Sequence, residues 1–453
     1  MGKSVCILGR QPALGLAELE SLYGSETVLP IGNTGALLNL EADHITMSRL
    51  GGSLKLGRYL TELPYTDWGR IEQFLTKQLP DYTADLEPGK IRLGLSLYGF
   101  NIHPRKLNAT GLTLKKAIRQ TSKSVRVVPN KTSELNAAQV IHNQLTGPSG
   151  FEVLLIKHQD KTIVAQTIAV QDINAYAARD QARPKRDARV GMLPPKLAQI
   201  IINLATGEKS VEAGEWKSGS ATVLDPFCGT GVVLQETMLM GYNAYGTDLE
   251  PRMVEYTATN LDWLNITSIK HRVNQGDAMN KEWVEPFSVI AGETYLGRPF
   301  STVPRPEKLR EVMQDVDTIH REFLQNVARQ TKKGFRLCIA VPAWYRGDTG
   351  GARAVRASAV HGADEQRTEP YIKYGEGVAQ SATKHSAASK GGVTSTARKQ
   401  VFATDRFWHL PVLDNIEELG YTRQSFVHVS KEDLIYHREG QIVGRELVVL
   451  QRN

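Results

Sequence analysis

A Gly-rich turn at residues 222–231 holds the residues best suited to binding a small ligand, in the sequence Thr-Val-Leu-Asp-Pro-Phe-Cys-Gly-Thr-Gly. Its apolar start predicts a short buried strand, and a helix is predicted after it at 232–240. Gly229 and Gly231 let the backbone turn sharply and approach a ligand closely. The free backbone N–H groups of such a turn point at whatever lies above the end of the strand.

Two carboxylates indicate what the turn binds. Asp225 lies inside the turn, where it would repel a pyrophosphate but suits a cationic or amine-bearing ligand, such as the methionine moiety of S-adenosylmethionine. Asp248 ends the next predicted strand, at 242–248, and is placed to accept hydrogen bonds from ribose hydroxyls. The glycine spacing is neither the dinucleotide fingerprint nor a phosphate loop. The alternative is an ordinary strand–turn–helix with incidental glycines, in which Asp225 only caps the turn.

The string Asp-Pro-Phe-Cys-Gly-Thr-Gly at 225–231 resembles motif I of the S-adenosylmethionine-dependent methyltransferases that modify exocyclic amines of nucleobases. The resemblance implies that Asp225 lies near the methionine amino group. It also implies that Asp277 bonds the adenine amino group and that the Ala278 backbone N–H faces the ring. The cofactor-binding residues implied in this way are Pro195, Asp225, Phe227, Gly229, Thr230, Gly231, Asp248, Leu249, Asp277 and Ala278.

The loop after the fourth predicted strand departs from that family's pattern. Amino methyltransferases usually carry Asp/Asn-Pro-Pro-Tyr/Phe there, whose carbonyl oxygens accept hydrogen bonds from the target amine while the ring stacks on the base. This chain reads Ile-Ala-Gly-Glu-Thr-Tyr-Leu-Gly-Arg-Pro at 290–299. Glu293 can accept from a guanine amine, and Tyr295 can stack on the base. The catalytic residues expected are Glu293, Thr294 and Tyr295, and the alternative is a loop that has lost catalysis.

The composition indicates a globular protein of two or three domains, with 453 residues, 23% of them charged and 41% hydrophobic. No apolar run is long enough for a membrane span, and the start of the chain lacks the pattern of a signal peptide. Cys6, Cys228 and Cys338 fit neither a disulfide framework nor metal-ligand spacing, so no metal is expected. Free cysteines of this kind are typical of a protein in the reducing cytoplasm. The net charge of +7 permits a nucleic-acid partner without proving one.

The N-terminal part alternates short strands with amphipathic helices. Strands are predicted at 4–8, 36–40, 54–60, 91–98, 125–128, 151–156 and 162–170, and helices at 14–23, 113–121 and 134–145. The phrase at 7–20, which begins Ile-Leu-Gly-Arg-Gln-Pro, resembles the leading domain of tRNA guanine N2-methyltransferases that carry a THUMP domain. The order of elements from residue 91 onwards is similar to a THUMP domain.

Basic residues cluster around the helix at 113–121 and in the connector that follows residue 176. Because the domain type resembles an RNA binder, phosphate contact is expected of this cluster. Arg298, in the loop at 290–299, can reach a phosphate or the guanine edge. A solvated helix face is the alternative for most single lysines. The residues expected to contact RNA are Lys115, Lys116, Arg119, Lys123, Arg126, Arg183, Arg186 and Arg298.

The C-terminal half alternates strands and helices, which implies a mostly parallel sheet with helices on both faces. Strands at 421–429 and 445–450 would add an antiparallel hairpin. The predicted fold class is α/β, with a Rossmann-like class I methyltransferase domain preceded by α+β ferredoxin-like and THUMP domains. The helix that Pro195 begins, before the first strand of the methyltransferase domain, resembles the family's motif X, which packs against the cofactor site. The predicted boundaries are 1–85 for the ferredoxin-like domain, 86–172 for the THUMP-like domain, 173–220 for the linker and motif X helix, and 221–453 for the methyltransferase domain.

The segment 346–400 breaks this alternation, being rich in Gly, Ala, Ser, Thr, Arg and Lys. A loop of this length inside a compact domain is either functional or disordered. We expect a disordered insertion, with transient RNA contact as the alternative.

The resemblance as a whole implies a cytoplasmic, S-adenosylmethionine-dependent RNA methyltransferase that acts on N2 of a guanosine in tRNA, position ten being the family's usual target. The THUMP unit would hold the acceptor end of the tRNA and set the distance to the methylated base. A ribosomal RNA guanine N2-methyltransferase and a catalytically inactive RNA-binding protein that retains the fold are the alternatives. No membrane partner is expected. Eukaryotic relatives use a small activator subunit, for which the sequence indicates no docking surface.

Overall fold

The described residues form two sheets that are joined through one buried helix. The computed structural model describes residues 2–87, 89–121, 123–187, 193–207, 221–300, 302–346 and 406–453. The predicted insertion at 346–400, apart from its first residue, and parts of the predicted linker at 173–220 lie outside these ranges. Among the helices described, none is long and apolar enough to cross a membrane.

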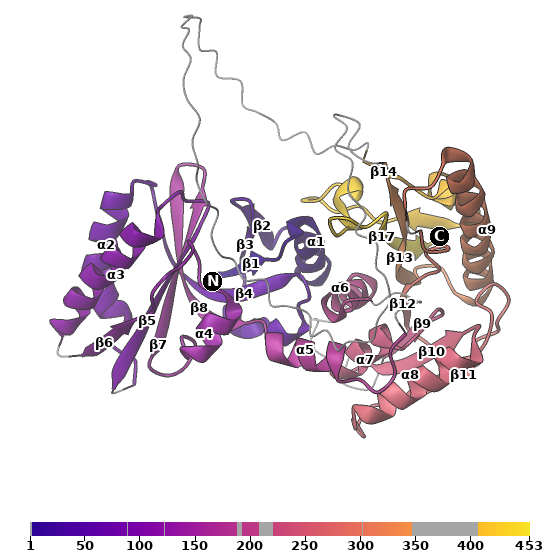
Figure 1. Cartoon of the computed structure of the whole chain (residues 1–453), viewed down its shortest axis with the longest axis horizontal. Helices are drawn as coiled ribbons and strands as arrows, with labels where there is room; N and C mark the ends of the chain where they lie inside the picture. Colours follow the sequence, from indigo (N-terminus) through magenta and orange to yellow (C-terminus); the bar gives the residue numbers. More distant parts are fainter. Residues whose placement is uncertain are drawn as a thin grey trace, which may run out of the picture. The chain divides into compact units, whose positions relative to one another are not determined.

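The first sheet runs in the order β2-β3-β1-β4-β8-β7-β5-β6 (Figure 1). Its strands are β1 (Ser4–Leu8), β2 (Val28–Ile31), β3 (Gly35–Leu38), β4 (Ser53–Leu63), β5 (Lys90–Tyr98), β6 (Ser124–Val127), β7 (Gly150–His158) and β8 (Lys161–Val170). β4 pairs with β8, so strands from the predicted segments 1–85 and 86–172 lie in one sheet. The boundaries of those segments, and the ferredoxin-like and THUMP assignments, stay predictions.

Helices α1 (Pro12–Tyr23), α2 (Trp68–Tyr82), α3 (Pro104–Arg119) and α4 (Ala137–His142) accompany this sheet. α2 and α3 lie side by side (Figure 1) and share a core with β5 and β7. α2 was not predicted, although Trp68, Ile71, Leu75 and Leu79 have helical spacing and are buried. Pro80 lies inside the last turn of α2, where proline is uncommon.

The second sheet runs in the order β11-β10-β9-β12-β13-β17-β15. Its strands are β9 (Thr222–Asp225), β10 (Asn243–Asp248), β11 (His271–Gln275), β12 (Val289–Glu293), β13 (Arg336–Tyr345), β15 (Tyr421–Arg423) and β17 (Val443–Arg452), with the short β14 (Phe407–Trp408) and β16 (Ile435–Tyr436) at its side. The strands from β11 to β13 are parallel, whereas β17 and β15 are antiparallel. This order confirms the predicted Rossmann-like sheet with its C-terminal antiparallel strands.

Helices cover both faces of this sheet: α6 (Pro195–Thr206), α7 (Val232–Leu239), α8 (Pro251–Trp263), α9 (Pro306–Gln330) and the 3-10 segment η4 (Pro411–Leu419). Alternating residues of β12 separate the faces, because Ile290 belongs to the core under α9 and Ala291 to the core under α6. The same alternation puts Glu293 on the α6 side and Thr294 on the α9 side. β12 therefore decides which side chains at its end face the ligand.

Helix α6 joins the two sheets, since it contacts α1 on one side and β12 and β13 on the other. In α1, the buried Glu18 carboxylate accepts hydrogen bonds from the backbone N–H groups of Gly51 (2.9 Å) and Gly52 (2.8 Å). It also accepts from the side-chain amide of Asn203 in α6, at 2.8 Å. One carboxylate thus ties three chain segments together at the junction.

The connector before α6 contains a helix that was not predicted, α5 (Ile173–Gln181). The side chain of Asp172 caps it by accepting from the backbone N–H groups of Asn174 and Ala175. Arg179 Nε donates to Glu236 Oε1 of α7 at 2.7 Å. The charged residues of the connector therefore fasten it to the second sheet's helices.

Replacement of Gly51 by alanine should destabilise the junction, because a Cβ there would lie 2.0 Å from the backbone oxygen of Lys196 in α6. We expect a loss of about 1–3 kcal/mol in the free energy of unfolding, measured by urea titration followed by circular dichroism. Gly69→Ala is the control, because its nearest neighbour is an Asp67 side-chain oxygen at 3.3 Å. Equal stability of the Gly51 variant and the wild type would contradict this close packing of the junction.

Candidate active site

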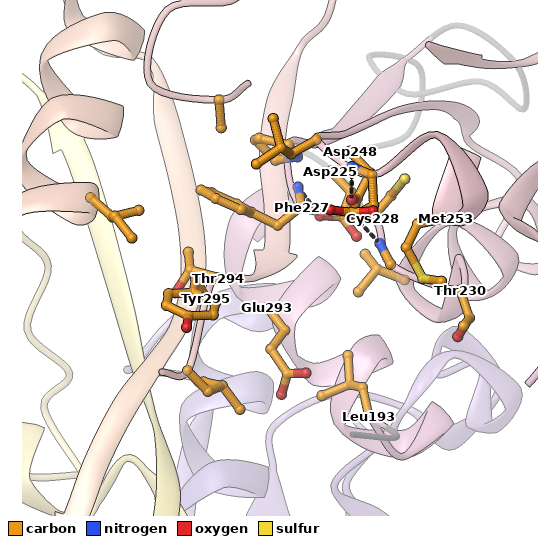
Figure 2. Close-up of a pocket in the computed structure, with 18 of the residues that line it drawn as sticks. Leu193, Asp225, Phe227, Cys228, Thr230, Asp248, Met253, Glu293, Thr294 and Tyr295 are labelled. Carbon is orange, nitrogen blue, oxygen red and sulfur yellow. Dashed lines mark hydrogen bonds between the residues drawn. The ribbon is translucent and has the colours of Figure 1, made fainter. Parts of the chain in front are cut away.

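A cavity of about 590 Å³ lies where β9, β10 and β12 end. The chain moves outwards from β9 to β10 and β11, then returns to β12 on the other side of β9. Parallel sheets bind ligands at the carboxyl edge beside such a reversal of strand order. Figure 2 shows Asp225, Asp248 and Phe227 on one side of this cavity, and Glu293 and Tyr295 on the other.

The Gly-rich turn forms the floor of the cavity. Gly229 and Gly231 adopt positive φ angles of 52° and 83°, which favour glycine. The Gly229 N–H donates to Asp248 Oδ2 at 2.8 Å, which joins the turn to the end of β10. Gly231 does not line the cavity, because its Cα faces Thr257 of α8, where a Cβ would lie 2.8 Å from the side chain. Gly229 and Thr230 line it, as predicted.

Asp225 is almost fully buried at the end of β9. Its Oδ1 accepts from the backbone N–H of Phe227 at 3.2 Å, which fits the turn-capping alternative. Burial raises the pKa of Asp225 well above its ordinary value, and the charges of Asp248 and Glu293 act in the same direction. Among the described residues no cation pairs with Asp225, so a cationic ligand group would offset the cost of its ionisation.

Asp248 has a structural role, because its two oxygens accept hydrogen bonds from the N–H groups of Gly229 and Glu250, at 2.8 and 3.0 Å. Burial nevertheless raises its pKa. A carboxylate can accept about four hydrogen bonds, so capacity is left for ribose hydroxyls. The predicted ribose role is therefore compatible with the second role that the structure adds.

The adenine end of the predicted site is assembled by the segment after β11. Asp277 Oδ1 accepts from the N–H of Met279 at 3.0 Å. The carbonyl of Ala278 accepts from the Asn326 amide of α9 at 3.0 Å, which holds this segment against the sheet. Leu249 is 59% exposed at the cavity mouth, where an apolar side chain can cover a planar ring.

The segment before α6 contributes Leu193 to the cavity, whereas Pro195 is buried as the first residue of α6 and does not line it. This corrects the expectation for Pro195, since a prolyl ring that starts a helix packs against the helix it begins. Met253 of α8 and Ile319 of α9 also line the cavity and were not predicted. Their only sequence signal is helical spacing, which indicates burial and not a ligand.

Thr294 lines the cavity, and its hydroxyl makes contacts within the protein. Its expected catalytic role stays a prediction. Thr294 is buried, and its hydroxyl lies 2.6 Å from Nε2 of the buried His320 in α9. His320 Nδ1 lies 2.7 Å from the Val316 carbonyl, which only accepts, so Nδ1 carries the proton. Burial lowers the pKa of His320 to about 4, so the ring is neutral near pH 7 and Nε2 accepts from the hydroxyl. The pair anchors the loop to α9.

Glu293 and Tyr295 line the cavity beside Thr294 (Figure 2). Glu293 is half-buried at the end of β12, and Arg445 Nε of β17 donates to its Oε1. Burial raises the pKa of Glu293, and the charge of Arg445 opposes this effect. Tyr295 is 40% exposed, so part of its side chain is accessible to a planar partner. Arg298 is exposed and also lines the cavity.

Two residues expected to contact RNA are occupied or buried. Lys123 Nζ donates to the carbonyls of Thr83 and Leu86, at 2.8 and 3.4 Å, and to that of Ala84. It therefore caps the C-terminus of α2, where a cation is favoured by unpaired carbonyls. Arg183 is 3% exposed and cannot reach a phosphate in this conformation. In the described structure its guanidinium nitrogens have no hydrogen-bond partner.

The other expected RNA contacts lie at or near the surface. Lys116, Arg119 and Arg126 are exposed on α3 and β6, and Lys115 is half-buried. Arg186 is exposed in the connector after α5. Charge and exposure at these positions are compatible with phosphate contact.

The charges that line the cavity suit S-adenosylmethionine. A buried, unpaired carboxylate at Asp225 suits a cationic methionine end, and the acids at Asp248 and Asp277 suit the ribose and adenine ends. Gly292 of β12 makes room for this arrangement, because a Cβ there would lie 2.4 Å from Asp225 Oδ1. Gly292 was not predicted as a functional residue, since the need for glycine comes from the neighbouring strand.

Gly292→Ala should displace the Asp225 carboxylate and weaken binding of S-adenosylmethionine about ten- to a hundredfold, as measured by isothermal titration calorimetry. The control is Gly444→Ala in β17, another strand glycine of the same sheet, whose nearest neighbours are an Ile435 methyl group at 3.2 Å and the Tyr436 backbone oxygen at 3.3 Å. We expect the control to bind like the wild type. Unchanged affinity in the Gly292 variant would remove Asp225 from the cofactor site.

Comparison with known proteins supports the sequence resemblance. A model of the N6_N4_Mtase family, described as DNA methylase, matches residues 155–259. The tRNA (guanine(10)-N2)-dimethyltransferase of Methanothermobacter thermautotrophicus is 33% identical over 186 residues, which are 40% of this chain and 48% of that protein. Its namesake from Methanocaldococcus jannaschii is 29% identical over 147 residues, 31% of this chain and 39% of that protein.

Among solved structures, TrmN from Thermus thermophilus aligns over the whole of both chains, with 13% identity and a TM-score of 0.44. The matched region spans less than half the length of the relatives compared above. Over about two fifths of its length, the chain is similar to tRNA (guanine(10)-N2)-dimethyltransferases, which confirms its resemblance to the guanine N2-methyltransferases.

Proposed function

We propose that this chain is an S-adenosylmethionine-dependent RNA methyltransferase that acts on N2 of a guanosine in tRNA. The observation that carries the proposal is one cavity that combines an acid-lined cofactor end with a carboxylate and an open aromatic ring. Asp225, Asp248 and Asp277 form the first part, and Glu293 and Tyr295 form the second. The names of the relatives favour position ten and two successive methylations.

S-adenosylmethionine supplies an already activated methyl group, so the protein needs to provide position more than acid–base chemistry. In this proposal Asp225 holds the cationic methionine end, Asp248 accepts from the ribose, and Asp277 accepts from the adenine amine. Leu249 covers the ring at the mouth of the cavity. Burial keeps water away from this end and strengthens each of these contacts.

The guanine would enter from the side of Tyr295, whose ring stacks on the base and holds its plane. Glu293 accepts a hydrogen bond from the N2 amine, which turns the nitrogen lone pair towards the methyl group. A monomethylated amine keeps one N–H, so the same contact remains available for a second transfer. Arg298 lies close enough to the cavity to contact a phosphate or the guanine edge.

The tRNA would also contact the exposed cations of α3 and β6, Lys116, Arg119 and Arg126. Such contacts supply affinity that does not depend on sequence. We place them on the THUMP-like part of the chain, which shares a sheet with the 1–85 segment through β4 and β8. α6 and the Glu18 junction pack that segment against the methyltransferase sheet. A cytoplasmic location is part of the same proposal.

Two features of the loop after β12 favour the alternative of a catalytically inactive RNA-binding protein. The loop lacks the Pro-Pro pair of amino methyltransferases, and one oxygen of Glu293 is already engaged by Arg445. A protein of that kind would bind cofactor and RNA without transferring the methyl group. The two functions differ in turnover alone, so an assay of transfer separates them.

Purified protein should transfer label from S-adenosylmethionine to total tRNA, and mass analysis of the nucleosides should find N2-methylated guanosine. Tyr295→Ala should lower turnover about ten- to a hundredfold, because stacking on one base is worth about 1–3 kcal/mol. Cofactor affinity should persist. Trp263→Ala is the control, an aromatic residue of equal exposure (39%) at the far end of α8. Label only in ribosomal RNA would favour a ribosomal RNA methyltransferase. Label in no RNA would favour the inactive RNA-binding protein.

Replacing Lys116 and Arg119 together by alanine should weaken tRNA binding and reduce the slope of log affinity against log salt by about 2, since each lost phosphate contact contributes about 0.9. The matched control replaces Lys332 and Lys333, exposed at the amino end of β13 and away from the cavity edge. Filter binding over a range of salt concentrations measures both. An unchanged slope in the first variant would exclude these cations from the RNA surface.

A further inference from the structure

Arg445 reaches the cavity from a strand that does not border it. It lies on β17, opposite Pro342 of β13, while Glu293 of β12 lies opposite Ala340 of β13. The guanidinium therefore extends across β13 to donate its Nε–H to Glu293 Oε1. Arg445 is buried, with 7% of its surface exposed. A buried arginine spanning a whole strand is more than a surface ion pair.

The pair leaves part of Glu293 available to a ligand. Among the described residues, no hydrogen bond is made to Oε2. Figure 2 shows the Glu293 side chain in the space between Tyr295 and Leu193. The carboxylate is thus fixed through one oxygen, and the other can accept from a bound amine. This is the geometry that methyl transfer to an exocyclic amine requires.

Glu293 shares the cavity with two other acids. Asp225 and Asp248 line the cavity from β9 and β10, and the charge of Glu293 helps to raise the pKa of Asp225. Arg298 and Tyr295 are on its own loop and more exposed, so water screens Arg298. Arg445 is the buried cation that contacts Glu293, and its charge opposes the rise in the carboxyl pKa that burial causes. Without it, the carboxyl group would be neutral over a wider range of pH.

We infer that Arg445 is a positioning residue for methyl transfer: it holds Glu293 ionised and oriented as the acceptor for the target amine. This inference rests on the proposed function and deepens it. It also supplies what the missing Pro-Pro pair would have given, because a fixed carboxylate replaces the fixed carbonyls of that pair. In this chain the acceptor is therefore built from two strands that are not neighbours.

The adjacent residue provides a matched control. Glu446 faces the other side of β17, where it accepts from Arg423 at 2.8 Å and from His409 at 2.5 Å. Arg423→Gln, in β15, therefore removes an arginine–glutamate pair that joins β15 to β17, without touching Glu293. Any effect that comes only from weakening β17 should appear in both variants.

The test compares Arg445→Gln, Arg445→Lys and Arg423→Gln in the full chain. Carboxyl-13C glutamate labelling with NMR follows the titration of Glu293, assigned by the loss of its signal in Glu293→Gln. We expect Arg445→Gln to move this titration to higher pH, to lower turnover on tRNA roughly a hundredfold, and to move the acidic limb of the rate profile to higher pH. Arg445→Lys, which keeps the charge, should restore part of the rate. Cofactor affinity and the Arg423→Gln titration should match the wild type.

Two failures can be told apart. If the wild type is active and Arg445→Gln has the same Glu293 titration and the same turnover, the role of Arg445 alone is overturned. An equal loss of turnover in Arg423→Gln would also overturn it. No methyl transfer by the wild type to any RNA would overturn the proposed function, and this inference with it. If Arg445→Gln does not fold, Arg445→Lys decides: reduced turnover with wild-type cofactor affinity supports the role, because the charge is kept and the guanidinium geometry is lost, and wild-type turnover rejects it.

Discussion

The repulsion between carboxylates at one edge of the second sheet is the constraint on which the cavity depends. Asp225, Asp248, Asp277 and Glu293 all lie there, and their negative charges are not all offset by the same kind of group. Backbone N–H groups satisfy Asp248 and Asp277, and Arg445 neutralises Glu293. Asp225 receives one N–H and no cation among the described residues. The charge that this site lacks is the charge that a sulfonium and ammonium ligand carries.

The compensating groups come from elements that have other tasks. The Gly-rich turn that donates to Asp248 also starts α7, and β17, which supplies Arg445, closes the sheet beyond β13. Gly292 leaves space for the Asp225 side chain in the neighbouring strand. Binding and fold therefore share the same contacts, so a change at Gly292 or Arg445 acts on the site through packing and charge together.

Local patterns predicted the parts of the site that lie close together in the sequence. Glycine spacing, apolar runs and an acid at the strand end predict the turn from Asp225 to Gly231 and the strand ending at Asp248. Thr294 and Lys123 make contacts within the protein that the sequence did not predict, for one shared reason. A hydroxyl beside His320, or an ammonium group at the end of α2, is recognisable only after distant segments meet. Residue type alone favoured chemistry at both.

By itself the sequence determined the alternation of strands and helices in the second half, the Gly-rich turn, and the acids that follow β9, β10 and β11, because these depend on periodicity and on neighbours along the chain. Only the tertiary structure decided that residues 1–85 and 86–172 contribute to one sheet, that Gly292 faces Asp225, and that Arg445 crosses β13 to reach Glu293. Those facts depend on strand order and register, which bring together residues far apart in the sequence, and no local pattern encodes such a meeting.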